Sequence, residues 1–291
     1  MHPDEKPSDD DAEVIRTLVA SAALEVIPMR SAEEKLQQVP TGTTITVTCS
    51  SKFGLDATLA LAATAAARGH RVIPHLAARQ IVDEAELGRI VETLVSTGIE
   101  DLFVIGGDAP DPAGEFASSA ELLEALARSG HTIRSVGVGC YPEGHPQIAD
   151  DVLVADLLRK QELAATYMVS QLCFHAGSLV DWVQRIRAAG VRLPLSLGLA
   201  APLKTRKLVE LSLRIGVGSS IKFLTHQRGF VGNLLVGNTY RPEHLLDEIG
   251  DDLTSDDLGI KGLHLFSFNQ VAATIAWQRE VDGSAPIELR P

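Results

Sequence analysis

The sequence predicts one (β/α)8 TIM barrel, a single-domain α/β fold, and three observations predict it. Short apolar runs alternate with longer amphipathic runs eight times along the 291 residues. The short runs are apolar on both faces, which is typical of parallel strands covered by helices. Four of the predicted helices are followed by a glycine, the residue that most often ends a helix: Gly69, Gly98, Gly130 and Gly190. Eight such units in succession close naturally into a barrel.

Each unit pairs one strand with the helix that follows it. The expected strands are 23–28, 43–49, 71–77, 101–108, 135–141, 167–174, 193–200 and 262–268. The expected helices are 31–39, 55–68, 84–97, 120–128, 151–165, 179–189, 204–215 and 271–277. A doubly wound open sheet is the competing architecture, and it favours a glycine-rich turn after its first strand. Met29, Arg30 and Ser31 follow the first strand instead, so the barrel is the better prediction.

Two segments do not follow this alternation. Residues 1–13 are acidic and polar and are expected to form a disordered tail, which leaves residues 14–291 for the catalytic barrel. The connection from Ser219 to Thr254 is longer than the others, and its glycine-rich part is expected to be a loop on or near the site. Pro242 suits the start of a helix, where its missing N–H is not needed.

Composition and charge exclude several classes of protein. The formal net charge is -12, which disfavours nucleic-acid binding and docking on anionic lipid. No apolar stretch approaches the roughly 20 residues of a membrane span. The three cysteines, Cys49, Cys140 and Cys173, are odd in number and far apart, so a disulfide framework is not expected. We therefore expect a cytoplasmic protein with small-molecule partners, and the sequence leaves open whether it forms a homo-oligomer.

Barrel enzymes carry their chemistry where the strands end, so the last polar residue of each strand is a candidate. These residues are Glu25, Thr48, His75, Asp108, Tyr141, Gln171, Ser267, Asn269 and Gln270, with Glu143, His145 and His175 in the adjoining loops. Glu25 lies in an otherwise apolar strand, where a carboxylate is costly unless it is paired or protonated. This setting suits a general acid. An ion pair with a residue such as Arg30 is the structural alternative.

Asp108 and Gln171 are the next candidates. Asp108 follows Gly106 and Gly107, which allow a ligand to approach the backbone closely, although an aspartate here also suits a turn. Gln171 can offer a donor and an acceptor to one edge of a heterocycle, or it can be a buried amide satisfied by backbone. The histidines include no His-x-His pair, so no metal site is expected, and a metal-dependent hydrolase remains only as an alternative.

Six strings in chain order resemble motifs of the methylenetetrahydrofolate reductases: LEVIPMR, IPHLAAR, GGDAP, CYPEGHPQ, VSQLCF and LHLFSFNQ. The resemblance implies a barrel that reduces 5,10-methylenetetrahydrofolate to 5-methyltetrahydrofolate with a flavin and a nicotinamide donor, in one-carbon and methionine metabolism. It also implies that Glu25 is the general acid that opens the folate's five-membered ring. Gln171 then binds the pterin, and Asp108 lies beside the reacting rings. The positions that match cofactor-lining residues are Thr48, His75, Gly107, Asp108, Tyr141, His145, Asp156, Arg159 and Lys160.

The sequence departs from the family's pattern mainly at cationic flavin contacts. Gly106 stands where the family has an arginine before Gly-Asp, and Gln270 stands where it has an arginine after the last-strand asparagine. Charge-assisted hydrogen bonds are worth about 1.5–3 kcal/mol each. We therefore expect FAD to bind weakly or not at all, and NADH, with NADPH as the other possibility, to pass hydride directly to the folate. An ordinary FAD-dependent reductase is the alternative within the family.

Overall fold

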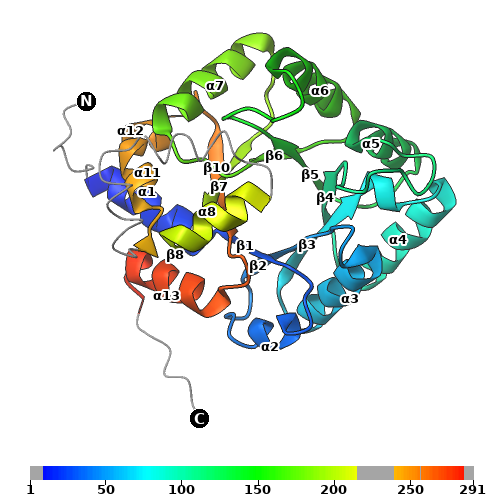
Figure 1. Ribbon diagram of the computed structural model, residues 1–291, viewed down its shortest axis with the longest axis horizontal. Helices are drawn as coiled ribbons and strands as arrows, with labels where there is room; N and C mark the ends of the chain where they lie inside the picture. The colour runs from blue at the N-terminus through cyan, green and yellow to red at the C-terminus, as the bar shows by residue number, and fades with distance from the viewer. Residues whose placement is uncertain (1–8, 215–238, 256, 285–291) are drawn as a thin grey trace.

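The computed structural model describes residues 9–214, 239–255 and 257–284, and within them eight parallel strands close into a barrel (Figure 1). The strands are β1 (Ala23–Val26), β2 (Thr44–Val47), β3 (Arg71–Ala77), β4 (Asp101–Ile105), β5 (Ser135–Cys140), β6 (Tyr167–Ser170), β7 (Leu195–Ala200) and β10 (Ile260–Phe266). β10 pairs with both β7 and β1 and so completes the ring. The predicted fold class is confirmed, and most strands end before the polar residues that were expected to finish them.

Helices follow the strands in the expected order, and most of them surround the barrel (Figure 1). They are α2 (Ala32–Leu36), α3 (Gly54–Ala67), α4 (Glu84–Ser96), α5 (Ser119–Arg128), α6 (Asp150–Leu163), α7 (Ala176–Ala189), α8 (Thr205–Arg214) and α13 (Val271–Asp282). Local sequence explains their ends. Ser118 and Glu121 form a capping box at the start of α5, and Gly190 ends α7 with a φ of 108°. No helix in the described ranges is long and apolar enough to cross a membrane.

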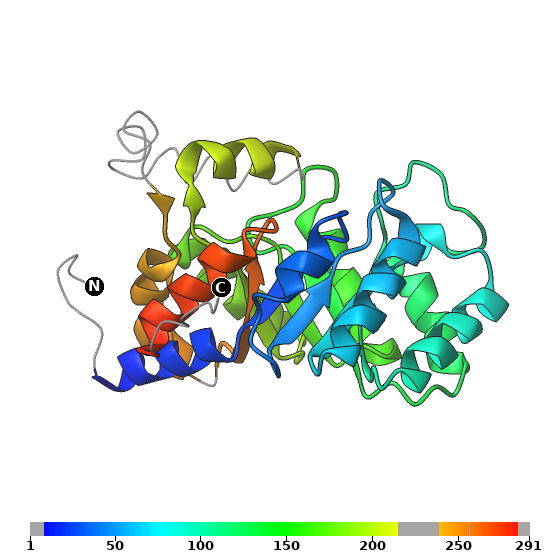
Figure 2. The ribbon, with the colours of Figure 1, turned by 90° about the horizontal axis from the view of Figure 1, so that it is seen from below.

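Helix α1 (Asp9–Ala20) begins inside the segment that was expected to be a disordered tail. Residues 9–13 are therefore helical, and residues 1–8 lie outside the described part of the chain. The Gln278 amide of α13 donates to the Val19 carbonyl at 2.9 Å, which ties α1 to the rest of the molecule at the end of the barrel opposite α8 (Figure 2).

A second, smaller layer lies over the carboxyl ends of the strands (Figure 2). It contains α8 and a two-stranded antiparallel sheet of β8 (Leu203–Lys204) and β9 (Thr239–Tyr240). α11 (Glu243–Glu248) and α12 (Gly250–Thr254) follow β9, and Pro242 is the N-cap of α11. The glycine-rich loop expected within 219–254 falls largely outside the described residues.

This layer has its own apolar cluster, separate from the main core. The cluster joins α8 to the loops that follow β6 and β10, and it is formed by Leu172, Phe174, Ala200, Leu203, Leu208, Val209, Leu211, Tyr240, Phe266 and Phe268. The cluster therefore covers the mouth of the barrel beside β6, β7 and β10.

The strands divide their side chains between two environments. Leu24, Val26 and Ile45 are fully buried in the main core beneath the helices. Alternate residues point into the barrel, as shown by the rings of His75 on β3 and His264 on β10, whose centroids are 6.5 Å apart although β1 and β2 separate these strands in the sheet. The barrel interior therefore holds polar groups as well as apolar ones.

Candidate active site

Glu25 lies one residue before the end of β1 and points into the barrel. It is 7% exposed, and its Oε2 lies 3.2 Å from Nε2 of His264 on β10. Its backbone carbonyl accepts a hydrogen bond from the Ser267 hydroxyl at 2.5 Å. The side-chain partner described for the Glu25 carboxyl is thus His264, not Arg30, which the structural alternative had proposed. A buried carboxyl group at the barrel mouth, with one oxygen fixed by a hydrogen bond, is suited to transfer a proton through its other oxygen.

The turn after β10 fixes the end of that strand against the end of β1. The Asn269 side chain accepts from the Ile27 N–H at 2.8 Å and donates to the Ile27 carbonyl at 2.9 Å. Lys35 donates to the Asn269 carbonyl at 2.7 Å. Phe268 and Asn269 have φ values of 47° and 59°, which cost a non-glycine residue about 1–3 kcal/mol each. The surrounding contacts hold this strained turn, and with it the relative position of Glu25 and His264.

Asp108 follows β4 and links two loops at the mouth. Its Oδ1 accepts from the Ser51 N–H, in the loop after β2, at 2.8 Å. Gly107 has a φ of 93°, and a Cβ at this position would lie 3.1 Å from the Ala77 Cβ, so a glycine is needed for this approach. Burial raises the pKa of the Cys49 thiol, and the negative charge of Asp108 adds to the effect.

Arg79 holds the segment that follows Asp108. Its guanidinium donates to the carbonyls of Ala109, Pro110 and Ala117 at 2.7, 2.6 and 3.0 Å. The sequence analysis did not identify Arg79 as a site residue, although Arg79 ends the string IPHLAAR. Its partners are backbone carbonyls of a loop about 30 residues away, and such contacts produce no recognisable sequence motif.

The Tyr-Pro-Glu-x-His-Pro segment after β5 is tied to the loop after β6. Glu143 Oε1 accepts from the N–H groups of Phe174 and His175 at 2.7 and 3.0 Å. Tyr141 and His145 pack edge to face with ring centroids 4.9 Å apart, and burial raises the pKa of Tyr141. The carboxylate of Glu143 therefore fixes the two loops that carry the predicted ligand residues of β5 and β6.

Gln171 and Thr48 both lie just beyond their strands. The Gln171 N–H donates to the Cys140 carbonyl at 2.8 Å, and its side-chain Oε1 accepts from the Leu172 N–H at 2.9 Å. The Thr48 N–H donates to the Val26 carbonyl at 3.0 Å. Backbone contacts thus place both residues at the mouth, and the predicted pterin contact of Gln171 remains a prediction.

His75 lies deeper than a mouth residue. It is 6% exposed, its ring packs 4.7 Å from that of Phe103, and burial lowers its pKa to about 4. It is therefore neutral at physiological pH. Its predicted role in lining a cofactor remains a prediction, but its position in the barrel interior makes it a neighbour of Glu25 and His264.

The three predicted cofactor residues of α6 lie away from this interior cluster. Lys160 is buried and forms an ion pair with Asp156, one helical turn earlier. Arg159 is 55% exposed and contacts Glu124 of α5 at 3.1 Å. Each cation thus already has a carboxylate partner within the protein.

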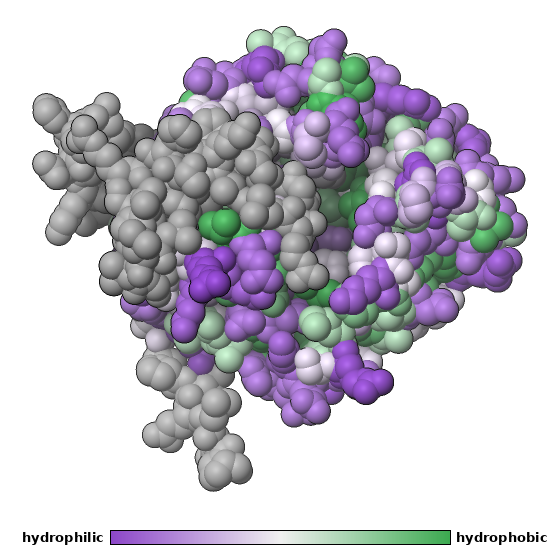
Figure 3. Space-filling model, in the orientation of Figure 1, coloured by the Kyte–Doolittle hydropathy of each residue, from purple (hydrophilic) through white to green (hydrophobic). Residues whose placement is uncertain are grey.

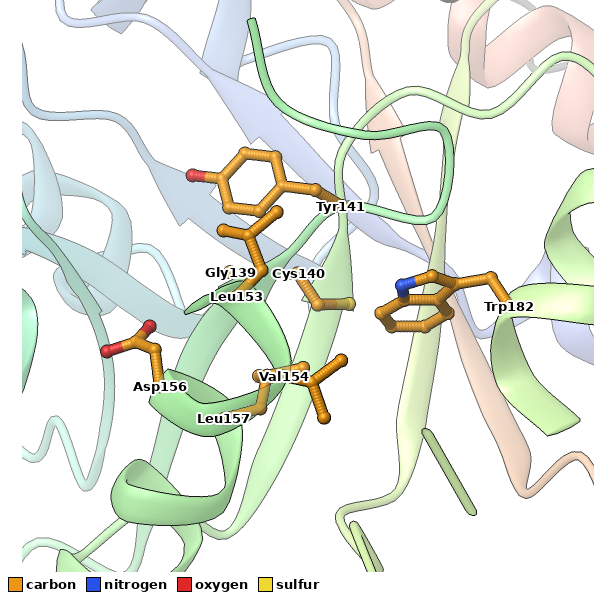
Figure 4. Close-up of a pocket in the computed structure, with 8 residues that line it drawn as sticks. All are labelled: Gly139, Cys140, Tyr141, Leu153, Val154, Asp156, Leu157 and Trp182. Carbon is orange, nitrogen blue, oxygen red and sulfur yellow. The ribbon is translucent and has the colours of Figure 1, made fainter. Parts of the chain in front are cut away.

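A small pocket lies beside α6 (Figure 4). Its lining residues are Gly139, Cys140, Tyr141, Leu153, Val154, Asp156, Leu157 and Trp182. Figure 4 shows Cys140 and Trp182 facing each other across it, whereas the carboxylate of Asp156 points away. It has room for about one water molecule.

A separate hollow lies near the centre of the face over the barrel, and apolar surface forms part of its wall (Figure 3).

The described residues do not fit a resident FAD well. A pyrophosphate is held by cations and helix N-termini, but Lys160 is buried against Asp156, and Gly106 and Gln270 carry no charge. A Cβ at Gly106 would meet no atom within 4 Å. A larger side chain therefore has room at this position, but the glycine supplies no charge.

Among the described residues, no group of three or more histidines, cysteines or carboxylates could hold a metal ion.

Fold and site together define an α/β TIM-barrel protein with a buried, histidine-paired carboxyl at its mouth. The sequence model of the family "Methylenetetrahydrofolate reductase" matches residues 26–214, and the chain belongs to this family. The match starts one residue after Glu25 and ends before β10.

Curated relatives from two yeasts match over shorter stretches. Methylenetetrahydrofolate reductase 2 of Saccharomyces cerevisiae is 23% identical over 119 residues, which is 38% of this chain and 20% of that protein. Methylenetetrahydrofolate reductase 1 of Schizosaccharomyces pombe is 26% identical over 110 residues, 35% of this chain and 18% of that protein. The matched stretches therefore span about a fifth of the length of these relatives.

Solved structures share the fold. A Clostridium thermocellum protein that binds two copies of 5-methyl-5,6,7,8-tetrahydrofolic acid has a TM-score of 0.59 at 10% identity, covering 90% of this chain and 94% of that one. Oxaloacetate acetylhydrolase in complex with oxalate has a TM-score of 0.52 at 12% identity, covering 95% and 86%. Identities this low show the barrel alone, since one barrel fold supports many chemistries.

Proposed function

We propose that this protein reduces 5,10-methylenetetrahydrofolate to 5-methyltetrahydrofolate, with Glu25 as the general acid. The observation that carries the proposal is the buried Glu25 carboxyl, held by His264 at the barrel mouth of a member of this family. Glu25 gives a proton to N10 of the folate while the bond from N10 to the bridging carbon breaks. The N5 iminium that forms accepts hydride at that carbon and becomes the methyl group. The donor, NADH, leaves as NAD+.

Asp108 and Gln171 position the substrate in this scheme. Asp108 lies on a loop fixed by Ser51 and Arg79, so its second carboxyl oxygen, Oδ2, can face the reacting rings and stabilise the iminium. Gln171 follows β6, beside the loop held by Glu143. A protein that shares this barrel fold binds 5-methyl-5,6,7,8-tetrahydrofolic acid, so the fold is compatible with a folate substrate.

We further propose that hydride passes directly from NADH to the folate, without a resident flavin. Support comes from Gly106 and Gln270, which lack the cationic side chains of the family's pattern, and from Lys160, which is committed to Asp156. An exposed ion pair is worth little, so Arg159 can exchange Glu124 for a donor phosphate at low cost. Transient binding of this kind suits a donor that enters and leaves in each cycle.

An absorbance spectrum of the purified protein tests the cofactor, and NADH consumption with methylenetetrahydrofolate tests the activity. We expect a colourless protein that oxidises NADH only when the folate is present, equally with and without added FAD. A yellow protein, or turnover that requires FAD, would show an ordinary flavin-dependent reductase. No turnover in either condition would overturn the folate assignment.

A further inference from the structure

Four polar side chains from four strands meet in the barrel interior beneath the mouth. Glu25 contacts His264 at 3.2 Å, and the His264 ring lies 6.5 Å from that of His75. Thr46 is the register partner of Glu25 on β2 and is 3% exposed. The scheme above uses only Glu25 of these groups, so the other three require an explanation of their own.

Burying this cluster is unfavourable. Thr46 Oγ1 and His75 Nε2 are buried without a hydrogen-bond partner among the described residues, and such atoms cost about 1–3 kcal/mol each. His264 is also buried, at 3% exposure, on a strand whose inward positions otherwise include Gly262 and Phe266. Apolar side chains would fill this interior at lower cost, and partly satisfied buried polar groups tend to mark function.

We infer that His264 is a positioning residue for the general acid, an inference that rests on the proposed function. Its Nε2–H donates to Glu25 Oε2, and this leaves Oε1 to carry the acidic proton toward the substrate. When that proton has gone to N10, the same N–H stabilises the carboxylate that remains. The charge on Glu25 thus develops against a donor already in place, so little reorganisation is needed.

The neighbours of Glu25 suit this arrangement. The titratable groups that face it among the described residues are His264 from β10 and His75 from β3, while β2 contributes Thr46, which does not titrate in this range. Burial lowers the pKa of His75 to about 4, so His75 adds no positive charge at neutral pH. The strained turn at Phe268 and Asn269 keeps β10, and therefore His264, in register with β1.

Two variants separate positioning from packing. His264→Gln keeps an N–H donor near the same place, and His264→Leu removes it. We expect H264L to lower kcat roughly 10- to 100-fold with little change in KM, which is less than the roughly 100- to 10,000-fold that a general acid itself contributes. The pH at which activity falls on the alkaline side should rise, because the carboxylate loses a stabilising donor. H264Q should recover most of both effects.

His70 offers a matched control, since it is a buried histidine that precedes β3. His70→Gln should change thermal stability at most and leave the pH profile in place. If H264L lowers the rate equally at every pH, or if H264Q behaves like H264L, His264 acts through packing alone and the inference is wrong.

A spectroscopic measurement decides the hydrogen bond even if the protein shows no turnover. Long-range proton–nitrogen spectra of protein labelled with 15N-histidine, assigned by loss of one signal set in H264Q, report which ring nitrogen carries the proton. We expect the Nε2–H form, with a change in its shifts in Glu25→Gln. The Nδ1–H form would overturn the inference, whereas absent turnover with the Nε2–H form would overturn only the proposed function.

Discussion

At the scale of single residues, Glu25 combines two properties that rarely occur together. It is buried inside the barrel, yet it lies at the end of a strand where a substrate can reach it. The contacts described for its carboxyl use Oε2, so the chemistry falls to Oε1. A glutamine at this position keeps the shape and the hydrogen bonding but supplies no acidic proton.

Glu25→Gln should therefore cut turnover about 100- to 10,000-fold, the range that general acids contribute. Folding should be unaffected, which far-UV circular dichroism and thermal unfolding would check beside the NADH-consumption assay. Glu92→Gln, at an exposed position of α4, is the matched control and should retain full activity. Equal activity in both variants would remove Glu25 from its role.

The proposal that FAD is not bound can be tested by adding positive charge at Gly106 and Gln270. A Cβ at Gly106 has open space around it, and Gln270 is exposed just before α13. Replacing both by arginine should tighten FAD binding roughly 10-fold or more per charge, since charge-assisted hydrogen bonds are worth about 1.5–3 kcal/mol. Flavin fluorescence quenching measures the affinity. Gly106→Gln, which adds bulk without charge, should leave it unchanged, and equal tightening there would refute the electrostatic argument.

At the scale of elements, the loops at the barrel mouth are joined in pairs. Ser51 and Asp108 join the loops after β2 and β4, and Glu143 joins those after β5 and β6. Arg79 fixes the segment that follows Asp108 with three hydrogen bonds to carbonyls. Substrate-facing residues are thus held on loops that cannot move independently, as preorganised catalysis requires.

Arg79→Lys should weaken this support, because an ammonium group cannot reproduce the planar fork of a guanidinium. We expect kcat/KM for the folate to fall about 10-fold and the melting temperature to fall by a few degrees. Arg89→Lys, on the exposed face of α4, should change neither. Unaltered kinetics in R79K would mean that the loop holds its shape without the guanidinium.

Local sequence predicted the strands and helices well because each βα unit has its own periodicity and stop signal. β3 was predicted at its observed bounds, 71–77, and α4 to within one residue. The pairing of Glu25 with His264 was not predicted, because 239 residues separate them. The alternation in β10 was the available signal, since it places His264 on the same inward face as Phe266.

Other features depended wholly on tertiary structure. The β8–β9 sheet has only two residues in each strand, too few for a periodic pattern. Helix α1 was partly hidden by its acidic start, which in composition resembles a disordered tail. Lys160 was identified as a cation that could meet a phosphate, but only the fold shows that Asp156 already pairs with it.

At the scale of the whole molecule, the polar interior links function to stability. His75 is neutral in the native barrel because burial lowers its pKa to about 4, against an ordinary value of 6.5. The unfolded chain therefore takes up a proton near pH 6.5, whereas the native state does so only near pH 4. Between these values the unfolded state binds more protons, so stability falls as the pH falls.

This linkage predicts that His75 alone lowers the free energy of unfolding by about 3 kcal/mol between pH 6.5 and pH 4, at about 1.4 kcal/mol per pKa unit. Urea unfolding at a series of pH values measures it, and a non-titrating variant such as His75→Gln should flatten the curve over that window. The variant should be less stable than the wild type at pH 7, where the wild-type imidazole is neutral and carries no protonation cost, and should approach it at pH 4.5. His131→Gln is the control, since His131 is near the surface and only its own smaller contribution should disappear. Parallel curves for wild type and H75Q would show that His75 exchanges protons with solvent in the native state, and the interior cluster around Glu25 would then have to be open to water.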